Sequence, residues 1–167
     1  MTATSEAVQR APDAIDPTDE RLRQLYAYWC ERCAGRPMPA RTDIDPLDFR
    51  YILGNIVLLG VERDPSSANP GPAGAMRFRV RLQGTKIVQR LGFDLTGRTL
   101  DDLAMPAFRA LITSAVAEVA TEGVPLLRQR NMVMDNRLLC YEALILPFAG
   151  ERGTVDTVMI GVLINGA

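Results

Sequence analysis

The chain has 167 residues, of which 47% are hydrophobic and 23% are charged, and its formal net charge is −1. This composition is typical of one soluble globular domain, and the lack of a strong positive charge argues against nucleic acid as a partner. No apolar run approaches the roughly 20 residues of a membrane-spanning helix, and residues 1–10 lack the apolar segment of a secretory signal. We therefore expect a cytoplasmic protein that engages no membrane.

Histidine is absent from the sequence, and its absence excludes several kinds of chemistry. Histidine is the most frequent general base and metal ligand in proteins and the usual ligand of haem iron. Ser-His-Asp and Cys-His catalysis therefore cannot be assembled, and a zinc site would need the three cysteines and carboxylates alone. We expect no catalytic residues, no metal site and no cofactor, and we interpret the chain as a non-enzyme.

The N-terminal part divides into a tail and an amphipathic helix. Residues 1–17 show no hydrophobic periodicity and predict a flexible tail. Residues 18–35 predict a helix, because apolar side chains recur at spacings of three and four. Gly35 followed by Pro37 would end it. The apolar face of this helix contains Leu22, Leu25, Tyr26 and Trp29.

Residues 36–167 predict an α+β domain whose central strands are apolar on both faces. The stretches 55–61 and 158–164 are almost continuously apolar, which is typical of strands covered from both sides. Residues 76–82 instead alternate apolar residues with arginines, which predicts an edge strand. The side chains expected to point inward from this strand are those of Met76, Phe78, Val80 and Leu82.

The second half of the chain predicts a helix followed by three strands. Pro106 stands where a first helical turn tolerates proline, and Gly123 is a signal for the end of a helix. Strands are expected at 126–134, 138–148 and 155–164. The residues expected on the buried face of the helix are Phe108, Leu111, Ile112, Ala115, Val116 and Val119.

Two motifs with chemical potential have simpler structural explanations. Cys30-x-x-Cys33 has the spacing of redox and half-zinc sites, but it falls inside a predicted helix and only Cys140 remains as another thiol. We interpret these cysteines as structural. Arginines alternate along residues 77–81 and 128–130 and could bind an anion. We interpret them as solvated faces of two strands.

Several short motifs resemble those of PAS domains. Residues 84–103 contain a Gly-aromatic pair, a Gly-Arg pair and an acidic-Leu ending, in the order of the PAS segment that follows the second strand. Residues 122–125 (EGVP) resemble the Gly-x-Pro segment before the third strand. The connector 39–46 and the pair Gly84-Thr85 are similar to those of a bacterial single-domain branch, the PAS-5 family. The first match is carried by Gly92-Phe93, Gly97-Arg98 and Asp102-Leu103.

The resemblance implies a PAS-like five-stranded antiparallel sheet in the spatial order 2-1-5-4-3, with helices on one face. The strands that are apolar on both faces would be central in this order, in agreement with their patterns. The connector between Phe93 and Gly97 is short, so one helix of ordinary PAS domains is expected to be reduced to a turn. The N-terminal helix would cover the other face or lie at a dimer interface, through Leu22, Leu25, Tyr26 and Trp29.

The resemblance also implies a stand-alone sensory or regulatory module in bacterial signalling. With no effector domain expected in the chain, output would pass through the N-terminal helix to a signalling protein partner, or by homodimerisation. The expected ligand is a small apolar or amphipathic molecule, which the Tyr141 hydroxyl could orient. The residues expected to line its cavity are Phe78, Val80, Phe93, Phe108, Ile112, Met132 and Tyr141.

Two other functions fit the sequence. One is a small α+β-barrel-like enzyme of the ketosteroid isomerase or cyclase kind, with a carboxylate and a tyrosine as acid and base. Asp43, Asp45 and Tyr141 are the groups that could serve it. The other is a protein-interaction domain that binds no ligand because its core is filled. Strand order would distinguish the enzyme fold, and a cavity would argue against the filled core.

Overall fold

The protein is built on one five-stranded antiparallel sheet. The computed structural model describes residues 15–64, 76–134 and 136–165, so most of the predicted tail lies outside the described residues. The strand order β2-β1-β5-β4-β3 confirms the order expected from the sequence. The strands are β1 (Ile56–Arg63), β2 (Met76–Gln83), β3 (Leu126–Met134), β4 (Arg137–Ala149) and β5 (Val155–Asn165).

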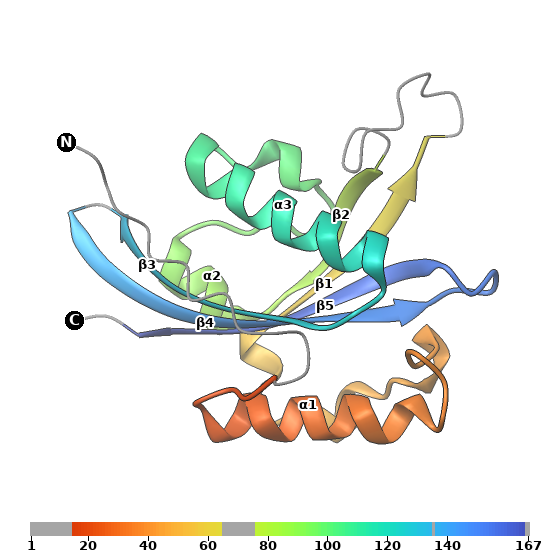
Figure 1. The fold of residues 1–167 in the computed structure, drawn as a ribbon. Helices are drawn as coiled ribbons and strands as arrows, with labels where there is room; N and C mark the ends of the chain where they lie inside the picture. The colour runs from red at the N-terminus through yellow and green to blue at the C-terminus, as the bar shows by residue number, and fades with distance from the viewer. Residues whose placement is uncertain (1–14, 65–75, 135, 166–167) are drawn as a thin grey trace.

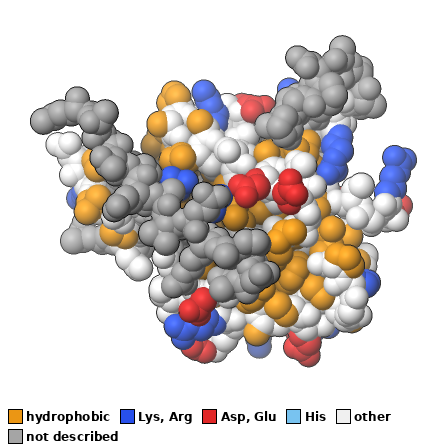
Figure 2. Space-filling view, in the orientation of Figure 1, with side chains coloured by type: hydrophobic (Ala, Val, Ile, Leu, Met, Phe, Trp, Pro, Cys, Tyr) orange, Lys and Arg blue, Asp and Glu red, His pale blue; other side chains and the backbone are white. Residues whose placement is uncertain are grey.

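Helices cover both faces of the sheet, which gives three layers. The long helix α3 (Pro106–Glu122) lies over one face, and α1 (Glu20–Cys33) lies across the other (Figure 1). The shorter α2 (Thr85–Leu91) follows β2 directly. Acidic and basic side chains are interspersed on the face shown in Figure 2, in agreement with a net charge near zero.

The central strands are buried on both faces, as their apolar patterns predict. In β1, Ile56 and Leu58 pack in the core on the α1 side. The next residue, Leu59, packs in the core under α3. In β5, Met159 packs in the core on the α1 side, and Ile160 packs in the core under α3. Each central strand therefore contacts both helical layers through alternate residues.

The predicted alternation of β2 is wrong at its last apolar residue. Phe78 and Val80 belong to the core under α3, as expected. Leu82 instead packs against the core on the α1 side. The strand pairing shows why: Leu59 is opposite Val80 and Leu58 is opposite Leu82, so Arg81 is an extra residue in β2. A β-bulge of this kind moves every following side chain to the opposite face.

The apolar stripe of α1 packs on the sheet of its own chain. Leu22, Leu25 and Trp29, three of the four residues offered by the sequence for a dimer interface, are buried there. The Trp29 indole Nε1 donates a hydrogen bond of 2.9 Å to the carbonyl oxygen of Pro147 in β4. Tyr26, the fourth, is half-buried and stacks on Trp29. Of the two positions expected for this helix, the structure has the one on the sheet.

Glu142 in β4 fastens the start of α1 to the sheet. Its side chain is only 7% exposed. It accepts hydrogen bonds from the Thr18 backbone N–H at 2.9 Å, from the Thr18 hydroxyl at 2.6 Å and from the Asp19 N–H at 3.2 Å. The Gln129 side-chain amide on β3 donates another. Burial raises the pKa of Glu142, but these hydrogen bonds outweigh it, so the pKa lies below its usual value.

Replacing Glu142 with glutamine (E142Q) should lower the free energy of unfolding by about 1–3 kcal/mol at neutral pH, the cost of losing buried hydrogen bonds to a charged group. The folded-state pKa is lower than the unfolded one, so the carboxylate stabilises the protein in full above its ordinary pKa of 4.5. This stabilisation is lost as the pH falls through the lowered folded-state pKa. Urea unfolding at several pH values should therefore show the difference between wild type and E142Q shrinking in acid.

The exposed Glu151, in the turn between β4 and β5, supplies the matched control. The variant E151Q should unfold like the wild type at every pH, because Glu151 has the same charge but none of these buried contacts. A destabilisation by E142Q that stays constant with pH would contradict the role given to the ionised carboxylate.

Gly84 joins β2 to α2 where two backbone segments come very close. Its N–H donates a hydrogen bond of 2.8 Å to the Ile56 carbonyl oxygen. A Cβ atom at Gly84 would lie 2.2 Å from the carbonyl oxygen of Gly54, which is backbone and cannot rotate away. The position therefore requires glycine because of space, and α2 begins directly after it.

Gly84→Ala should destabilise the fold by at least about 1–3 kcal/mol, because the added methyl group displaces backbone in a packed region. Gly54→Ala is the matched control, since a Cβ there would meet the flexible side chain of Lys86 at 3.1 Å. Thermal unfolding should show a clear loss for Gly84→Ala and a much smaller one for Gly54→Ala. Equal losses would contradict the assignment.

Candidate ligand-binding site

A cavity of about 160 Å³ lies between α3, α2 and the sheet. Its walls are mainly apolar: Ile112 comes from α3, Ile87 from α2, and Val57 and Ile160 from the two central strands. A dry apolar cavity of about 150 Å³ is large enough to take up benzene or xenon. The core under α3 is therefore incompletely filled, and the space fits a small apolar group.

Five of the seven residues that the sequence offered for ligand contact line this cavity. They are Val80, Phe93, Phe108, Ile112 and Tyr141. Phe78 is buried in the core under α3 but is not among the lining residues. The backbone of Met132 pairs with Leu139 in the β3–β4 ladder, whereas its side chain lies outside the described part of the structure.

The connector after α2 is held against β2 by a side-chain amide. The Gln83 amide nitrogen donates a 3.0 Å hydrogen bond to the Phe93 carbonyl, and its oxygen accepts one of 2.8 Å from the Leu95 N–H. Further along, the Val80 N–H donates to the Arg98 carbonyl at 2.8 Å. No helix forms between Phe93 and Gly97, as the short connector predicts. The bonds fix Phe93 as one wall of the cavity.

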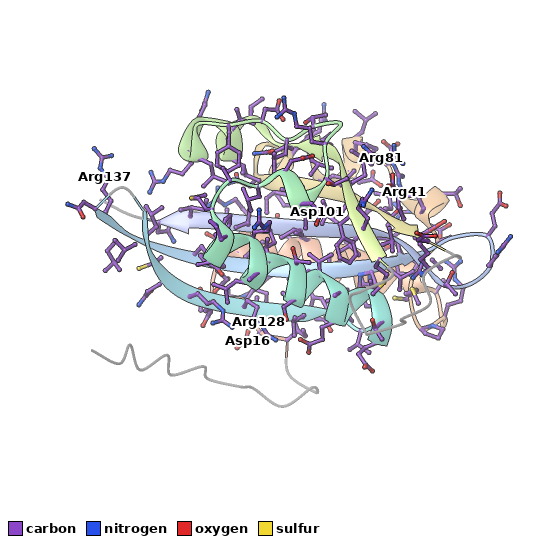
Figure 3. The ribbon with its side chains drawn as sticks, turned by 90° about the horizontal axis from the view of Figure 1, so that it is seen from above. Asp16, Arg41, Arg81, Asp101, Arg128 and Arg137 are labelled. Carbon is purple, nitrogen blue, oxygen red and sulfur yellow. The ribbon has the colours of Figure 1, made fainter. Side chains whose placement is uncertain are left out.

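Sequence reasoning missed Arg128 and Arg130 as residues of this site. Both line the cavity, on the face of β3 that also faces α3. The interpretation of the two arginines as a purely solvated strand face is therefore wrong for the residues of β3. The arginines of β2 lie at the other edge of the sheet, and Figure 3 shows Arg81 far from Arg128. In β2, Arg79 pairs with Glu62 of β1.

Tyr141 is a half-buried tyrosine in the lining of the cavity. Burial raises the pKa of this phenol, and the positive charges of Arg130 and Arg128 act in the opposite direction. Among the described residues the hydroxyl has no hydrogen-bond partner. A phenol with a raised pKa stays protonated at neutral pH, so it can donate a hydrogen bond to a ligand.

Leu111 of α3 is exposed, although the sequence predicted it on the buried face of the helix. It also lines the cavity, yet 42% of its surface is exposed. Val116 and Val119, on the same expected face, are fully buried in the core. Leu111 therefore lies where the cavity meets the solvent, beside the exposed Ser114.

The structure does not assemble the acid and base considered for an enzyme. The Asp43 carboxylate accepts hydrogen bonds from the Ala40 N–H and from Arg36, which lower its pKa. Asp45 caps a short helical turn by accepting from the Leu47 N–H. Both lie in the connector that packs beside α1, whereas Tyr141 faces the cavity under α3. The sheet separates these carboxylates from the phenol.

The three cysteines are free thiols, and they lie outside the cavity. Cys30 is exposed and Cys33 half-buried on α1, and Cys140 is exposed on β4. Burial raises the pKa of Cys33. Within residues 15–64, 76–134 and 136–165, no group of three cysteine or carboxylate side chains is placed to hold a metal ion. In the same ranges no helix has both the length and the hydropathy needed to span a membrane.

Solved PAS domains have similar structures at low sequence identity. The PAS domain of BvgS from Bordetella pertussis is 18% identical, with a TM-score of 0.48, and the match covers 72% of this chain and 86% of that one. The PAS domain of the histidine kinase ThkA is 18% identical, with a TM-score of 0.45 and coverage of 65% and 95%. A PAS domain from Colwellia psychrerythraea is 14% identical, with a TM-score of 0.40 and coverage of 74% and 98%.

The family comparison agrees with the motifs and the strand order. No curated protein matches the chain. A family model described as a PAS domain matches residues 18–164, which is most of the sequence and includes all three layers of the fold. The chain therefore belongs to the PAS-5 family of PAS domains.

Proposed function

We propose that this PAS domain is a sensory or regulatory module that binds a small, largely apolar ligand in the cavity under α3. The observation that carries the proposal is the cavity itself, which has mainly apolar walls and is lined by Tyr141, whose hydroxyl has no hydrogen-bond partner among the described residues. Natural ligand sites combine apolar walls with a few polar groups that orient the ligand. A domain that only binds other proteins would be expected to have a filled core, so the cavity favours ligand binding over that alternative.

The proposed output element is α1, which contacts the same strands as the ligand. Ile160 of β5 lines the cavity, and the next residue, Gly161, faces α1. A Cβ atom at Gly161 would lie 2.7 Å from the Cδ2 atom of Leu25 and 3.0 Å from that of Leu22. Because α1 packs so closely on β5, a shift of this strand on ligand binding would also shift the helix.

The partner in this proposal is a signalling protein or a second copy of the chain. The buried stripe of α1 is occupied by its own sheet, so a partner would bind the opposite side of the helix. The residues exposed there include Arg23, Gln24, Ala27 and Glu31. We assign the domain no catalytic step, since the carboxylates considered for one lie across the sheet from Tyr141.

Filling the cavity from within should prevent ligand uptake. Ala115 of α3 lines the cavity, and Ala115→Leu places additional apolar atoms there. In titrations followed by two-dimensional amide NMR, benzene should shift the signals of cavity residues in the wild type. The variant should bind benzene at least about tenfold more weakly, because the free volume is lost. Ala110→Leu, an exposed position of the same helix, is the control and should bind like the wild type.

Benzene affinities that are equal in wild type and Ala115→Leu would contradict the proposed site. Native mass spectrometry of protein purified from its source provides an independent measurement. It should show a small molecule retained by the wild type and lost or reduced in Ala115→Leu.

The same spectra measure the proposed coupling to α1. Saturating benzene should shift amide signals of Leu22, Leu25 and Gly161 in the wild type, because the two sides of β5 share one backbone. These shifts should disappear in Ala115→Leu together with those of the cavity. Shifts confined to the α3 side of the sheet would leave the cavity as a binding site and would contradict α1 as the output element.

A further inference from the structure

The charged groups of the cavity lining and the Tyr141 phenol come from neighbouring elements, namely β3, β4 and the middle of α3, whereas the polar Gln83 lines the cavity from β2. Arg130 and Tyr141 are directly opposite each other in the β3–β4 ladder. Side chains of directly opposed residues point to the same face, with Cβ atoms about 4.5–5.5 Å apart. Arg128 lines the same end from the next position on that face of β3. A guanidinium and a phenol are therefore neighbours at the edge of an apolar space.

Among the described residues that line this end of the cavity, two arginines stand against one carboxylate, which leaves one excess positive charge. Arg128 forms an ion pair with Glu118 of α3, with 3.1 Å between the guanidinium Nη2 and the carboxylate Oε2. Arg130 has neither a carboxylate partner nor a hydrogen bond among the residues that the structure describes. Its side chain is half-buried, so it is partly removed from water without a compensating charge. An anionic group bound at this position would satisfy it.

We propose that the ligand is a small amphipathic carboxylate, an inference that rests on the proposed function of the cavity. The carboxylate accepts hydrogen bonds from the guanidinium of Arg130 and the hydroxyl of Tyr141. The apolar part, about the size of a benzene ring, lies among Phe108, Ile112 and Val162. A planar guanidinium matches the two oxygens of a carboxylate. The single unpaired charge and the nearby Glu118 disfavour a dianionic phosphate.

The experiment compares two probes of nearly equal shape, phenylacetate and its neutral amide phenylacetamide, by calorimetric titration of the full chain. The wild type should bind phenylacetate at least about tenfold more tightly, because only the carboxylate pairs with Arg130. In Arg130→Gln the two affinities should become equal within about twofold. Arg152→Gln, in the exposed β4–β5 turn, removes the same charge far from the cavity and should keep the wild-type preference.

Tyr141→Phe tests the second contact without removing a charge. It should weaken phenylacetate binding by about threefold to tenfold, the usual effect of losing one hydrogen bond. It also keeps the test decisive if Arg130→Gln does not fold, which thermal unfolding would reveal. In that case an unchanged affinity of Tyr141→Phe for phenylacetate overturns the proposal.

The remaining outcomes separate the ligand class from the cavity. Equal wild-type affinities for the two probes, or a preference that survives in Arg130→Gln, overturn the carboxylate assignment and leave the apolar site intact. Failure of both probes to bind, while benzene binds the wild type and not Ala115→Leu, also overturns it. If benzene does not bind the cavity either, the proposed function itself fails.

Discussion

The pairing of β1 with β5 is the constraint on which the rest of the fold depends. Val57 and Ile160 are partners in this ladder although they are far apart in the chain, so the pairing closes a long loop at an entropic cost. Burial of apolar side chains on both faces of both strands offsets that cost. Without this ladder the cavity would lose its floor, and α1 would lose the surface on which its apolar stripe packs.

Alternation along β4 and β3 links the cavity to the start of α1. Tyr141 faces the cavity, and the next residue, Glu142, holds the N-terminus of α1 on the other face. The same alternation is present on β3. Arg128 and Arg130 line the cavity, and Gln129 between them donates a hydrogen bond to Glu142. The polar end of the cavity and the attachment of α1 thus share two adjacent stretches of backbone. In the proposed function, a ligand that draws Arg130 and Tyr141 together would act on the segment that positions α1.

The sequence was sufficient for the sheet but not for every side chain on it. Two doubly apolar stretches identified the central strands, and short motifs identified the family. Nothing in the alternating residues 76–83 signals the extra residue at Arg81, so the direction of Leu82 could not be predicted. Strand 126–134 mixes apolar and polar residues on both faces, and its pattern did not show that Arg128 faces the core. The apolar stripe on α1 predicts that this face of the helix is buried, but it does not indicate whether the same chain or a second copy covers it.

The charge of Arg130 offers a physical reason for a cavity at this position. A cavity lined only by apolar groups favours collapse or filling by larger side chains, because lost packing contacts are costly. A half-buried arginine in its lining is different, because its aliphatic stem can cover apolar wall while its guanidinium needs water or an anion. Filling the space with protein would cost the solvation of that charge unless a carboxylate came with it. Glu118 already pairs with Arg128, so among the described residues Arg130 has no carboxylate partner, and in our proposal the carboxylate of the ligand supplies it.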